Sequence, residues 1–425
     1  MFFTYKEAEA FFEKRKAIGI KPGLERVHYL LEKLNHPEKE VAAIHVAGTN
    51  GKGSTIQFVK EALIASGYKV GIFTSPSFSD VCGHFFIDNQ TICRREALSL
   101  LNELLPFIEE LDREGMHPTE FEILTVMAFV YFKGRTDFVL LETGMGGRFD
   151  TTNCQDPVLA IITNVAKDHM QFLGGRLTDI AWHKAGIIKE NCPVIVGKVD
   201  KESKTIIHKE AEEKSSQVFK LFSHFDYAIL NEKSFVWSNQ SDKKFLFSLQ
   251  LKGTHQAENA SLAFMALHLL EAKGFEIDWQ AAIKSISVAS LPGRFELVFR
   301  HPKIILDSAH NVAGIKAFLR TAEENYPDEE KQLLFAGFKD KQISEMLSEI
   351  KNSFDKVTLT TFDHERASSL EDLFSIAAEK QFEIAKDWQT YLEPILKKQD
   401  ADIVYFVTGS LDFITQVRNW LVKKN

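Results

Sequence analysis

Apolar runs of strand length recur along the chain, and most are followed by a polar or glycine-rich turn and then by a helical pattern. Residues 41–47 predict a first strand, GTNGKGST forms the turn, and residues 55–65 predict a helix that ends at Ser66-Gly67. Such alternation produces a parallel sheet covered by helices, so the predicted fold class is α/β. The same patterns predict strands over 69–73, 137–141 and 158–163, and helices over 95–114, 121–132 and 177–188.

A second α/β series begins after Leu291-Pro292-Gly293, where a Pro-Gly turn marks a hinge. Between about 200 and 251 the pattern is irregular, and we expect a peripheral sheet of the first domain there. The expected domains are therefore 1–293 and a compact second domain, 294–425. Within the second, strands are predicted over 303–306, 333–335, 356–360 and 403–407, and a final helix over 411–422.

Composition narrows the class of protein. The 425 residues are 44% hydrophobic and 26% charged, which excludes a disordered or low-complexity chain. With 51 basic and 59 acidic residues the net charge is -8, so a nucleic-acid binder that relies on a basic face is not expected. The four cysteines form no CxxC pair, which predicts reduced thiols. No apolar run reaches membrane-spanning length, and the start lacks a signal-peptide core, so we expect a soluble cytoplasmic protein without membrane contacts.

The segment GTNGKGS, residues 48–54, lies between a predicted strand and a predicted helix. Glycines there let backbone N–H groups face phosphate oxygens, Lys52 adds a cation, and the helix N-terminus adds its positive end. The segment is not a strict Walker A motif, because Gly53 stands between Lys52 and Ser54. The alternative is a tight turn with an incidental lysine. The context favours binding of a nucleotide phosphate.

Two further polar segments follow predicted strands. ETGMGGRFDTTN begins at Glu142, and NVAKDH places Asp168 and His169 after the next strand. Open α/β sheets bind ligands at this edge, where a carboxylate can hold Mg²⁺ that bridges phosphates. Taken alone, Glu142 could be a solvated loop acid and His169 a structural histidine. Their convergence beside a phosphate loop favours the functional interpretation.

Lysines and polar clusters elsewhere carry a weaker signal. Spacing alone makes Lys184, in HKAGIIK, a lysine of an amphipathic helix whose ammonium reaches water. Asn259 in HQAENA, Arg294 in LPGR, and Asp307 and His310 in DSAHN are polar residues at element ends, and each would by itself be a cap or a turn.

A larger pattern emerges when the segments are taken in order. The chain resembles folylpolyglutamate synthase and its bifunctional dihydrofolate synthase form, in the Mur ligase superfamily, through GTNGKGS, TSP, TEFE, ETGMGGRFDTTN, KDH, HKAGIIK, HQAENA, PGR and DSAHN. The resemblance extends to Gly409-Ser410 and thus covers nearly the whole chain. It implies an ATP-dependent amide ligase with a P-loop-containing N-terminal domain, a parallel-rich sheet and a smaller Rossmann-like C-terminal domain.

The resemblance also implies a role for each motif residue. Asn50, Gly51, Lys52 and Gly53 would hold the ATP phosphates, and Asn259, Arg294 and Asp307 would contact adenine, phosphate and ribose. Ser75, Glu142 and His169 match Mg²⁺ ligands. Lys184 matches a carbamylated lysine that helps to hold a second Mg²⁺, which inverts the interpretation from spacing. Lys52, Lys184 and His310 would be catalytic, with His310 near the place where the incoming glutamate is expected.

The implied reaction joins L-glutamate to a folate. The γ-carboxylate of the folate attacks the γ-phosphate of ATP, giving an acyl phosphate and ADP, and the glutamate amine then displaces phosphate. Dihydropteroate is a second acceptor in bifunctional members, and Asp150 lies in the segment that contributes to its binding there. The family precedent is a monomer.

Two departures leave alternatives open. After TSP the family usually has an NERI-type segment, whereas here SFSDVCGHFFIDNQ places Cys82-Gly83-His84 on the folate side. Ser308 stands in DSAHN where glycine is usual. The alternatives are a related Mur-type ligase with another carboxylate acceptor, an ATP-binding paralogue that has lost the acceptor site, and a plain phosphate-loop ATPase. Glutamate-dependent turnover separates them.

Overall fold

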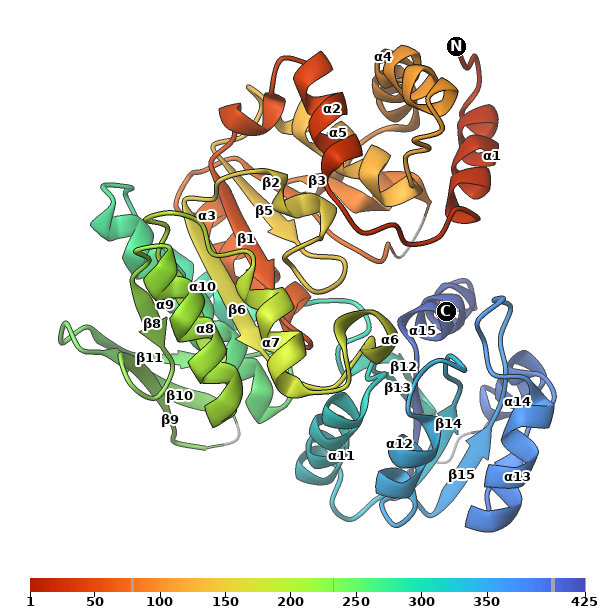
Figure 1. Cartoon of the computed structure of the whole chain (residues 1–425). Helices are drawn as coiled ribbons and strands as arrows, with labels where there is room; N and C mark the ends of the chain where they lie inside the picture. Colours follow the sequence, from red (N-terminus) through yellow and green to blue (C-terminus); the bar gives the residue numbers. More distant parts are fainter. Residues whose placement is uncertain (78–79, 232, 399–401, 425) are drawn as a thin grey trace. The chain divides into compact units, whose positions relative to one another are not determined.

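The structure is a computed structural model that describes residues 1–77, 80–231, 233–398 and 402–424, and it divides into two compact units (Figure 1). The N-terminal unit comprises Met1–Ala166, Met170–Ser248 and Ala257–Ala289; the C-terminal unit comprises Lys167–His169, Leu249–Gln256 and Ser290–Asn425. The main break thus falls a few residues before the expected boundary after Gly293. Two short segments from earlier in the chain also group with the C-terminal unit, which a single linear boundary does not anticipate.

An eight-stranded sheet forms the centre of the N-terminal unit. Strand β1 lies between β5 and β6, with β2 beyond β5, and these four strands are parallel (Figure 1). Every residue of β1 and β5 is buried, which explains their continuous apolar sequence. In sheet order the strands are β4 (Gln90–Thr91), β3 (Phe85–Ile87), β2 (Val70–Phe73), β5 (Phe138–Glu142), β1 (Ala43–Ala47), β6 (Leu159–Asn164), β7 (Val194–Lys198) and β8 (Val218–Lys220).

Helices bury the apolar residues of this sheet. Ala43, Val139, Leu141 and Phe73 belong to a core shared with the first helices of the chain, and Ala160, Ile162 and Val194 belong to another core shared with later ones. The helices of the unit are α1 (Tyr5–Lys16), α2 (Glu25–Lys33), α3 (Lys52–Ala65), α4 (Arg94–Arg113), α5 (Glu120–Phe132), α6 (Met170–Leu173), α7 (Leu177–Ala185), α8 (Lys201–Glu213), α10 (Trp279–Val288) and most of α9 (Thr254–Ala272), with 3-10 turns η1 (Pro37–Glu40), η2 (Val81–His84) and η3 (Thr151–Cys154).

The region from 200 to 251 contains the expected small sheet but more order than its pattern predicts. Strands β9 (Phe225–Ile229), β10 (Ser234–Asn239) and β11 (Lys244–Ser248) form an antiparallel three-stranded sheet. The prediction missed helix α8 and also the β3–β4 hairpin. The helix predicted over 177–188 is also too long, since α7 ends at Ala185 and Gly186 caps it.

The C-terminal unit is a second α/β layer structure. Its six-stranded sheet is parallel except for β12, which pairs antiparallel with β13. In sheet order the strands are β12 (Glu296–Arg300), β13 (Lys303–Leu306), β17 (Ile403–Thr408), β14 (Glu330–Phe335), β15 (Lys356–Leu359) and β16 (Glu383–Ile384). The helices are α11 (Val312–Asn325), α12 (Ile343–Ile350), α13 (Leu370–Lys380), α14 (Trp388–Ile395) and α15 (Leu411–Val422).

The four strands and the final helix predicted for this part are confirmed to within a few residues, whereas β12 and β16 were not predicted. Apolar side chains from both faces of the sheet form two cores with these helices. In the described part of the chain, no helix combines the length and the apolar character needed to cross a bilayer.

Candidate functional site

The glycine-rich turn after β1 leads directly into α3, which begins at Lys52 rather than at the predicted residue 55. Gly51 caps the helix with a φ of 83°, a left-handed conformation that favours glycine. A Cβ on Gly51 would lie 2.3 Å from Oδ1 of Asn259, and one on Gly48 would lie 1.8 Å from Oγ1 of Thr163. Both glycines are therefore required by close packing, and Asn259 lies against the turn.

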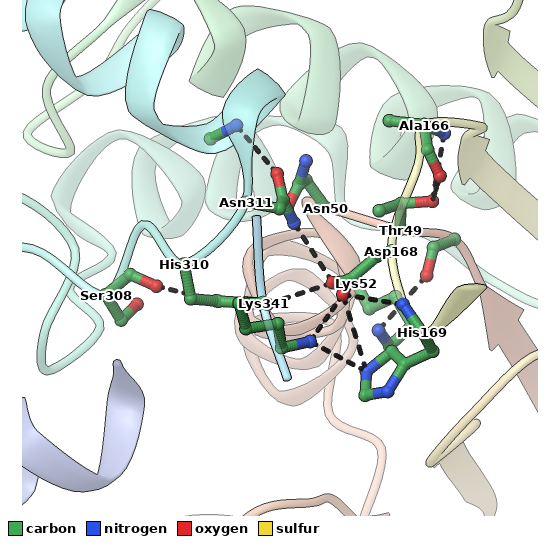
Figure 2. A network of polar contacts seen from close by, with 12 residues as sticks. Thr49, Asn50, Lys52, Ala166, Asp168, His169, Ser308, His310, Asn311 and Lys341 are labelled. Atoms are coloured by element: carbon green, nitrogen blue, oxygen red, sulfur yellow. Dashed lines mark hydrogen bonds and ion pairs between the residues drawn. The ribbon is translucent and has the colours of Figure 1, made fainter. Parts of the chain in front are cut away.

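Hydrogen bonds to β6 and the residues after it fix the turn. The amide of Thr49 donates to the Asn164 carbonyl at 3.2 Å, and the amide of Asn50 donates to Oδ1 of Asn164 at 2.9 Å. The Thr163 hydroxyl donates to the Asn50 carbonyl at 2.6 Å. Figure 2 shows Thr49 also bonded to Ala166, at 3.0 Å. A turn held this firmly presents the unpaired N–H groups of the first turn of α3 as a preorganised anion site.

Glu142 and Lys52 face each other at the carboxyl edge of the sheet. Lys52 Nζ donates to the Gly48 carbonyl at 3.1 Å and lies 3.9 Å from Oε1 of Glu142. The Thr74 hydroxyl donates to the other carboxylate oxygen. Glu142 is 7% exposed, so its charge is buried beside a cation and is not that of a solvated loop acid.

Ser75 follows Thr74 at the same edge and is half-buried. Carboxylate and hydroxyl oxygens are the donors that Mg²⁺ prefers, so Glu142 and Ser75 fit this ion chemically. Among the described residues, no group of three His, Cys, Asp or Glu side chains could by itself hold a metal. A metal held by Glu142 would therefore need other kinds of ligand, such as hydroxyl and phosphate oxygens.

The segment ETGMGGRFDTTN packs against the end of α7, which carries Lys184. The amide of Arg148 donates to the His183 carbonyl at 2.7 Å. A Cβ on Gly147 would lie 2.8 Å from that carbonyl oxygen, and one on Gly186 would lie 2.3 Å from Cβ of Arg148. The glycines on both sides of the contact thus allow the helix end and the loop to touch.

Lys184 is 3% exposed, which does not fit a lysine that extends its ammonium into water. The interpretation from spacing alone is therefore wrong for this residue. The nearby Lys189 is structural, because its Nζ donates to the Asn153 carbonyl at 2.9 Å while Asn153 donates to the Gly186 carbonyl at 2.9 Å. Burial lowers the pKa of Lys189.

Asp150 shapes the turn that follows. Its carboxylate accepts from the amides of Met145 at 2.8 Å and Thr152 at 3.1 Å. Burial raises the pKa of Asp150, although these hydrogen bonds oppose the rise. The carboxylate thus organises the loop whether or not it also contacts an acceptor.

In the C-terminal unit, Asp168 is the centre of a buried polar cluster (Figure 2). One oxygen accepts from the His169 amide at 2.8 Å and from Lys341 Nζ; the other accepts from Asn311 Nδ2 at 3.1 Å and lies 3.3 Å from Nε2 of His310. Burial alone would raise the pKa of Asp168, but His310, Lys341 and His169 hold it far below its usual range.

Arg294 and Asp307 form a second cluster in the C-terminal unit. Asp307 accepts from the amides of Phe295 and Ala309, both at 2.9 Å. Burial raises the pKa of Asp307, and Arg294 opposes that rise. Burial together with Arg294 and Arg320 lowers the pKa of His255 to about 4. The cluster combines a neutral imidazole with cationic groups.

Comparison with known proteins shows to which family the chain belongs. The family models for the Mur ligase middle domain and for the Mur ligase glutamate ligase domain match residues 46–267 and 293–411. The chain is 36% identical to the dihydrofolate synthase/folylpolyglutamate synthase of Bacillus subtilis, over 99% of this chain and all of that one. The chain belongs to the dihydrofolate synthase/folylpolyglutamate synthase family of Mur ligases.

Solved structures of the family share the fold. The folylpolyglutamate synthase of Thermotoga maritima is 30% identical, with a TM-score of 0.84 over 99% of this chain and 98% of that one. The E. coli FolC structure in complex with DHPP and ADP is 26% identical, with a TM-score of 0.88 over the same shares. The predicted fold class, two α/β domains with parallel-rich sheets, is thereby confirmed.

The departures from the family pattern can now be located. Ser308 does not have a positive φ, so this turn does not require glycine, and its amide donates to the Gly293 carbonyl at 2.9 Å. In the divergent segment, residues 78 and 79 lie outside the described residues, Cys82 lies 3.3 Å from the Tyr5 hydroxyl, and His84 contacts Thr74. His84 therefore lies beside the edge that carries Glu142, because the hydroxyl of Thr74 donates to Glu142.

Sequence reasoning missed several residues that the fold brings to these clusters. Thr74 could have been noted, since it precedes Ser75 of the TSP segment. Lys341 carried no local signal, because it lies in a charged turn and meets Asp168 from 173 residues away. His310 has Nδ1 at 2.8 Å from the Ser308 carbonyl and Nε2 facing Asp168, so its contact with glutamate stays a prediction.

Proposed function

We propose that this chain is an ATP-dependent ligase that adds L-glutamate to the γ-carboxylate of a tetrahydrofolate through an acyl phosphate. The observation that carries the proposal is the phosphate turn with Lys52 beside the buried Glu142, in a chain that covers family members along nearly their whole length. The ATP-binding part would be residues 1–293 and the ligase part residues 294–425, and the matched family models support this division.

Within the N-terminal unit, Asn50, Gly51, Lys52 and Gly53 bind the ATP phosphates. Support comes from the position of Lys52 at the start of α3 and from the left-handed cap at Gly51. Asn259 lies against the same cap and contacts the adenine. Arg294 and Asp307 in the C-terminal unit contact phosphate and ribose. The ADP and AMPPCP complexes of relatives agree with nucleotide binding by this family.

Ser75, Glu142 and His169 are proposed Mg²⁺ ligands, and a carbamylated Lys184 is proposed to help hold a second ion. The burial of Lys184 supports this assignment, because the side chain lies inside the protein instead of extending into water. Bound Mg²⁺ would neutralise charge on the transferring phosphoryl group. His169 lies within the Asp168 cluster, so that cluster would set its orientation.

The residues of the chain then have distinct tasks in the reaction. Lys52 places a cation at the γ-phosphate while the acceptor carboxylate attacks, and it remains beside the acyl phosphate. Lys52 is itself oriented by Gly48 and Glu142, so little rearrangement is needed when charge develops. His310, a proposed catalytic residue, would orient the glutamate amine, which attacks the activated carbonyl and releases phosphate.

A second acceptor, dihydropteroate, is favoured by two observations. Asp150 lies in the ordered loop between Glu142 and Asn153, and the Bacillus subtilis relative carries both activities in its name. On this proposal the chain also makes dihydrofolate.

The deciding experiment measures phosphate release from Mg-ATP and L-glutamate with tetrahydrofolate, dihydropteroate or no acceptor, with products identified by mass. A mass increase of one glutamyl residue with tetrahydrofolate supports the ligase, and the same increase with dihydropteroate supports the second activity. ATP binding without glutamate-dependent turnover would instead favour a paralogue with a lost acceptor site. Glutamate-independent hydrolysis would indicate a phosphate-loop ATPase.

A further inference from the structure

A pocket in the C-terminal unit, between the first turns of α12 and α13, has no task in the proposed reaction. These helices follow the neighbouring strands β14 and β15 (Figure 1), and the segments that lead into them pair at Phe338 and Ala367. The pocket has a volume of about 390 Å³. Open α/β sheets bind ligands beyond the carboxyl ends of their strands, and pockets for small molecules begin at about 300 Å³. Its position and size therefore suit a small ligand.

The first turn of α12 presents N–H groups to this pocket. Its N-cap, Gln342, makes no side-chain hydrogen bond to the backbone, and the Ile343 amide donates to the Lys341 carbonyl at 2.8 Å. Among the described residues, no acceptor engages the amides of Ser344 and Glu345, and both residues line the pocket. Uncapped amides at the positive end of a helix favour a negatively charged group.

Ser368 gives an independent indication of a ligand. It lines the pocket and is 2% exposed, yet in the described part of the chain its hydroxyl has no hydrogen-bond partner. Its amide donates to the Gly337 carbonyl at 3.0 Å, which holds the residue in place. An unpaired buried hydroxyl is unfavourable. A polar group in the pocket would supply the partner that the protein does not.

The first turn of α13 brings a negative charge to the same pocket. Ser369 and Asp372 form a capping box, in which the Asp372 amide donates to the Ser369 hydroxyl at 3.1 Å. Hydrogen bonds from Ser369 lower the pKa of Asp372, and Lys339 adds to the effect. Asp372 is therefore an ionised carboxylate at the exposed rim of the pocket.

The other charged side chains of the pocket differ in how far they are engaged. Lys341 is paired with Asp168, and Glu345 accepts from the Gln342 side-chain amide at 2.7 Å. Lys339 Nζ donates to the Glu365 carbonyl at 3.3 Å, and no ion pair engages it within the described ranges. Lys339 and Asp372 thus bring opposite charges to one pocket without contacting each other.

We propose that this pocket binds a free α-amino acid as a zwitterion. The carboxylate of the ligand would lie at the first turn of α12, beside Lys339 and the Ser368 hydroxyl, and its ammonium group would face Asp372. Asp372 would repel a simple anion and Lys339 a simple amine. A ligand that carries both charges satisfies both side chains.

The apolar residues of the pocket indicate the class of amino acid. Ile343 and Leu373 are buried, Ile376 is half-buried, and all three line the pocket, so an aliphatic side chain would find apolar contacts there. The glutamate of the proposed reaction is expected at His310, which precedes α11 and does not line this pocket. The pocket would therefore be a second amino-acid site.

Calorimetric titration of the full chain, without ATP or acceptor, tests the proposal with L-norvaline and its two matched fragments. Pentanoate lacks the ammonium group of norvaline, and butylamine lacks its carboxylate. Norvaline is expected to bind with a Kd of about 1 mM or lower, and each fragment at least about tenfold more weakly. Binding of either fragment as tightly as norvaline would overturn the inference.

Variants show whether the ligand lies in this pocket. Lys339→Gln and Asp372→Asn, which keeps an oxygen able to cap α13, are each expected to weaken norvaline binding at least about fivefold. The control Lys351→Gln makes the same charge change as Lys339→Gln at the other end of α12, where Lys351 is exposed, and should leave binding unchanged.

Ser368→Ala supplies a readout that a merely structural role would not move. The variant should weaken norvaline binding, while the denaturant midpoint of the free protein stays the same or rises, because an unpaired buried hydroxyl has been removed. A lower midpoint with unchanged norvaline binding would assign Ser368 a structural role and contradict the proposal.

The remaining outcomes are equally decisive. Absence of norvaline binding to wild type at about 10 mM would overturn the inference, as would binding by Lys339→Gln within about twofold of wild type. L-Glutamate is the last probe: if it binds and norvaline does not, the pocket selects a side-chain carboxylate and the inference is wrong. Ligase turnover enters none of these measurements, so the proposed function can fail without affecting this inference.

Discussion

Replacing Asp168 by Asn should destabilise the C-terminal unit strongly. The Asp168 and Lys341 side chains are 6% and 7% exposed, so the substitution leaves a buried ammonium without its carboxylate. Breaking a buried ion pair by removing one partner costs about 3–5 kcal/mol. A second estimate gives a similar figure. The NH₂ group of the new asparagine would face hydrogen-bond donors where Asp168 has an accepting oxygen, and two lost hydrogen bonds to a charged group cost about 3–6 kcal/mol.

Denaturant unfolding, followed by fluorescence and circular dichroism, measures this loss. The matched control is Asp340→Asn, whose partner Arg366 is 43% exposed and whose loss should cost about 1 kcal/mol or less. Adding Lys341→Met to Asp168→Asn should recover part of the loss, because the unpaired ammonium is then absent. A loss below about 1 kcal/mol for Asp168→Asn would refute the argument, since the carboxylate would then not be stabilised by its buried partners.

The pH dependence of the same variant has a definite sign. The pKa of Asp168 is lower in the folded state than in the unfolded state. Its contribution to the free energy of unfolding is therefore complete above the unfolded carboxyl pKa of about 3.9, and it declines as the pH falls below that value. The stability difference between wild type and Asp168→Asn should therefore hold from about pH 8 to about pH 5 and shrink below about pH 4. A difference that already shrinks near neutral pH would mean that another group carries the effect.

Three other substitutions test the N-terminal unit. Gly51→Ala should lower nucleotide affinity and cost about 1–2 kcal/mol from the left-handed backbone alone, before the overlap with Asn259, as measured by nucleotide titration and denaturant unfolding. Lys184→Ala should lose ligase activity and regain part of it with added short organic acids; failure of every acid tried would count against carbamylation. Glu142→Gln should abolish Mg²⁺-dependent phosphate release while metal-free ATP binding, measured by calorimetry, persists through Lys52.

Local patterns predicted the part of the fold that builds the phosphate turn. An apolar strand, a glycine-rich turn and a helix follow one another within the first 65 residues, so one stretch of sequence contains the whole feature. The start of α3 was placed late because Gly53 lies in its first turn, and glycine is a poor helix former. Helix α8 was missed because its sequence, KESKTIIHKEAEE, is largely charged, and two of its four buried residues, Ser203 and Glu210, are polar.

The polar clusters of the C-terminal unit could not be predicted from local sequence, because only the fold brings their residues together. Asp168 lies beside His169 in sequence, but its partners His310, Asn311 and Lys341 come from more than 140 positions away. Nothing local distinguishes Lys341 from the other lysines of the chain. The resemblance to a known family supplied His310, whereas Lys341 and Asn311 became visible through their contacts.

The motif glycines show why a resemblance in sequence carried so much structural information. Gly51 adopts a backbone conformation that favours glycine and also lies against Asn259, whereas Gly147 and Gly186 allow α7 to touch the loop after β5. A Cβ at Gly51 would overlap Asn259, and a Cβ at Gly147 or Gly186 would overlap the contact between the loop and the end of α7, which carries Lys184. A motif whose glycines are each required by close packing has few sequence alternatives. Its residues therefore identify the geometry, and through it the chemistry that the geometry permits, more specifically than the α/β fold does.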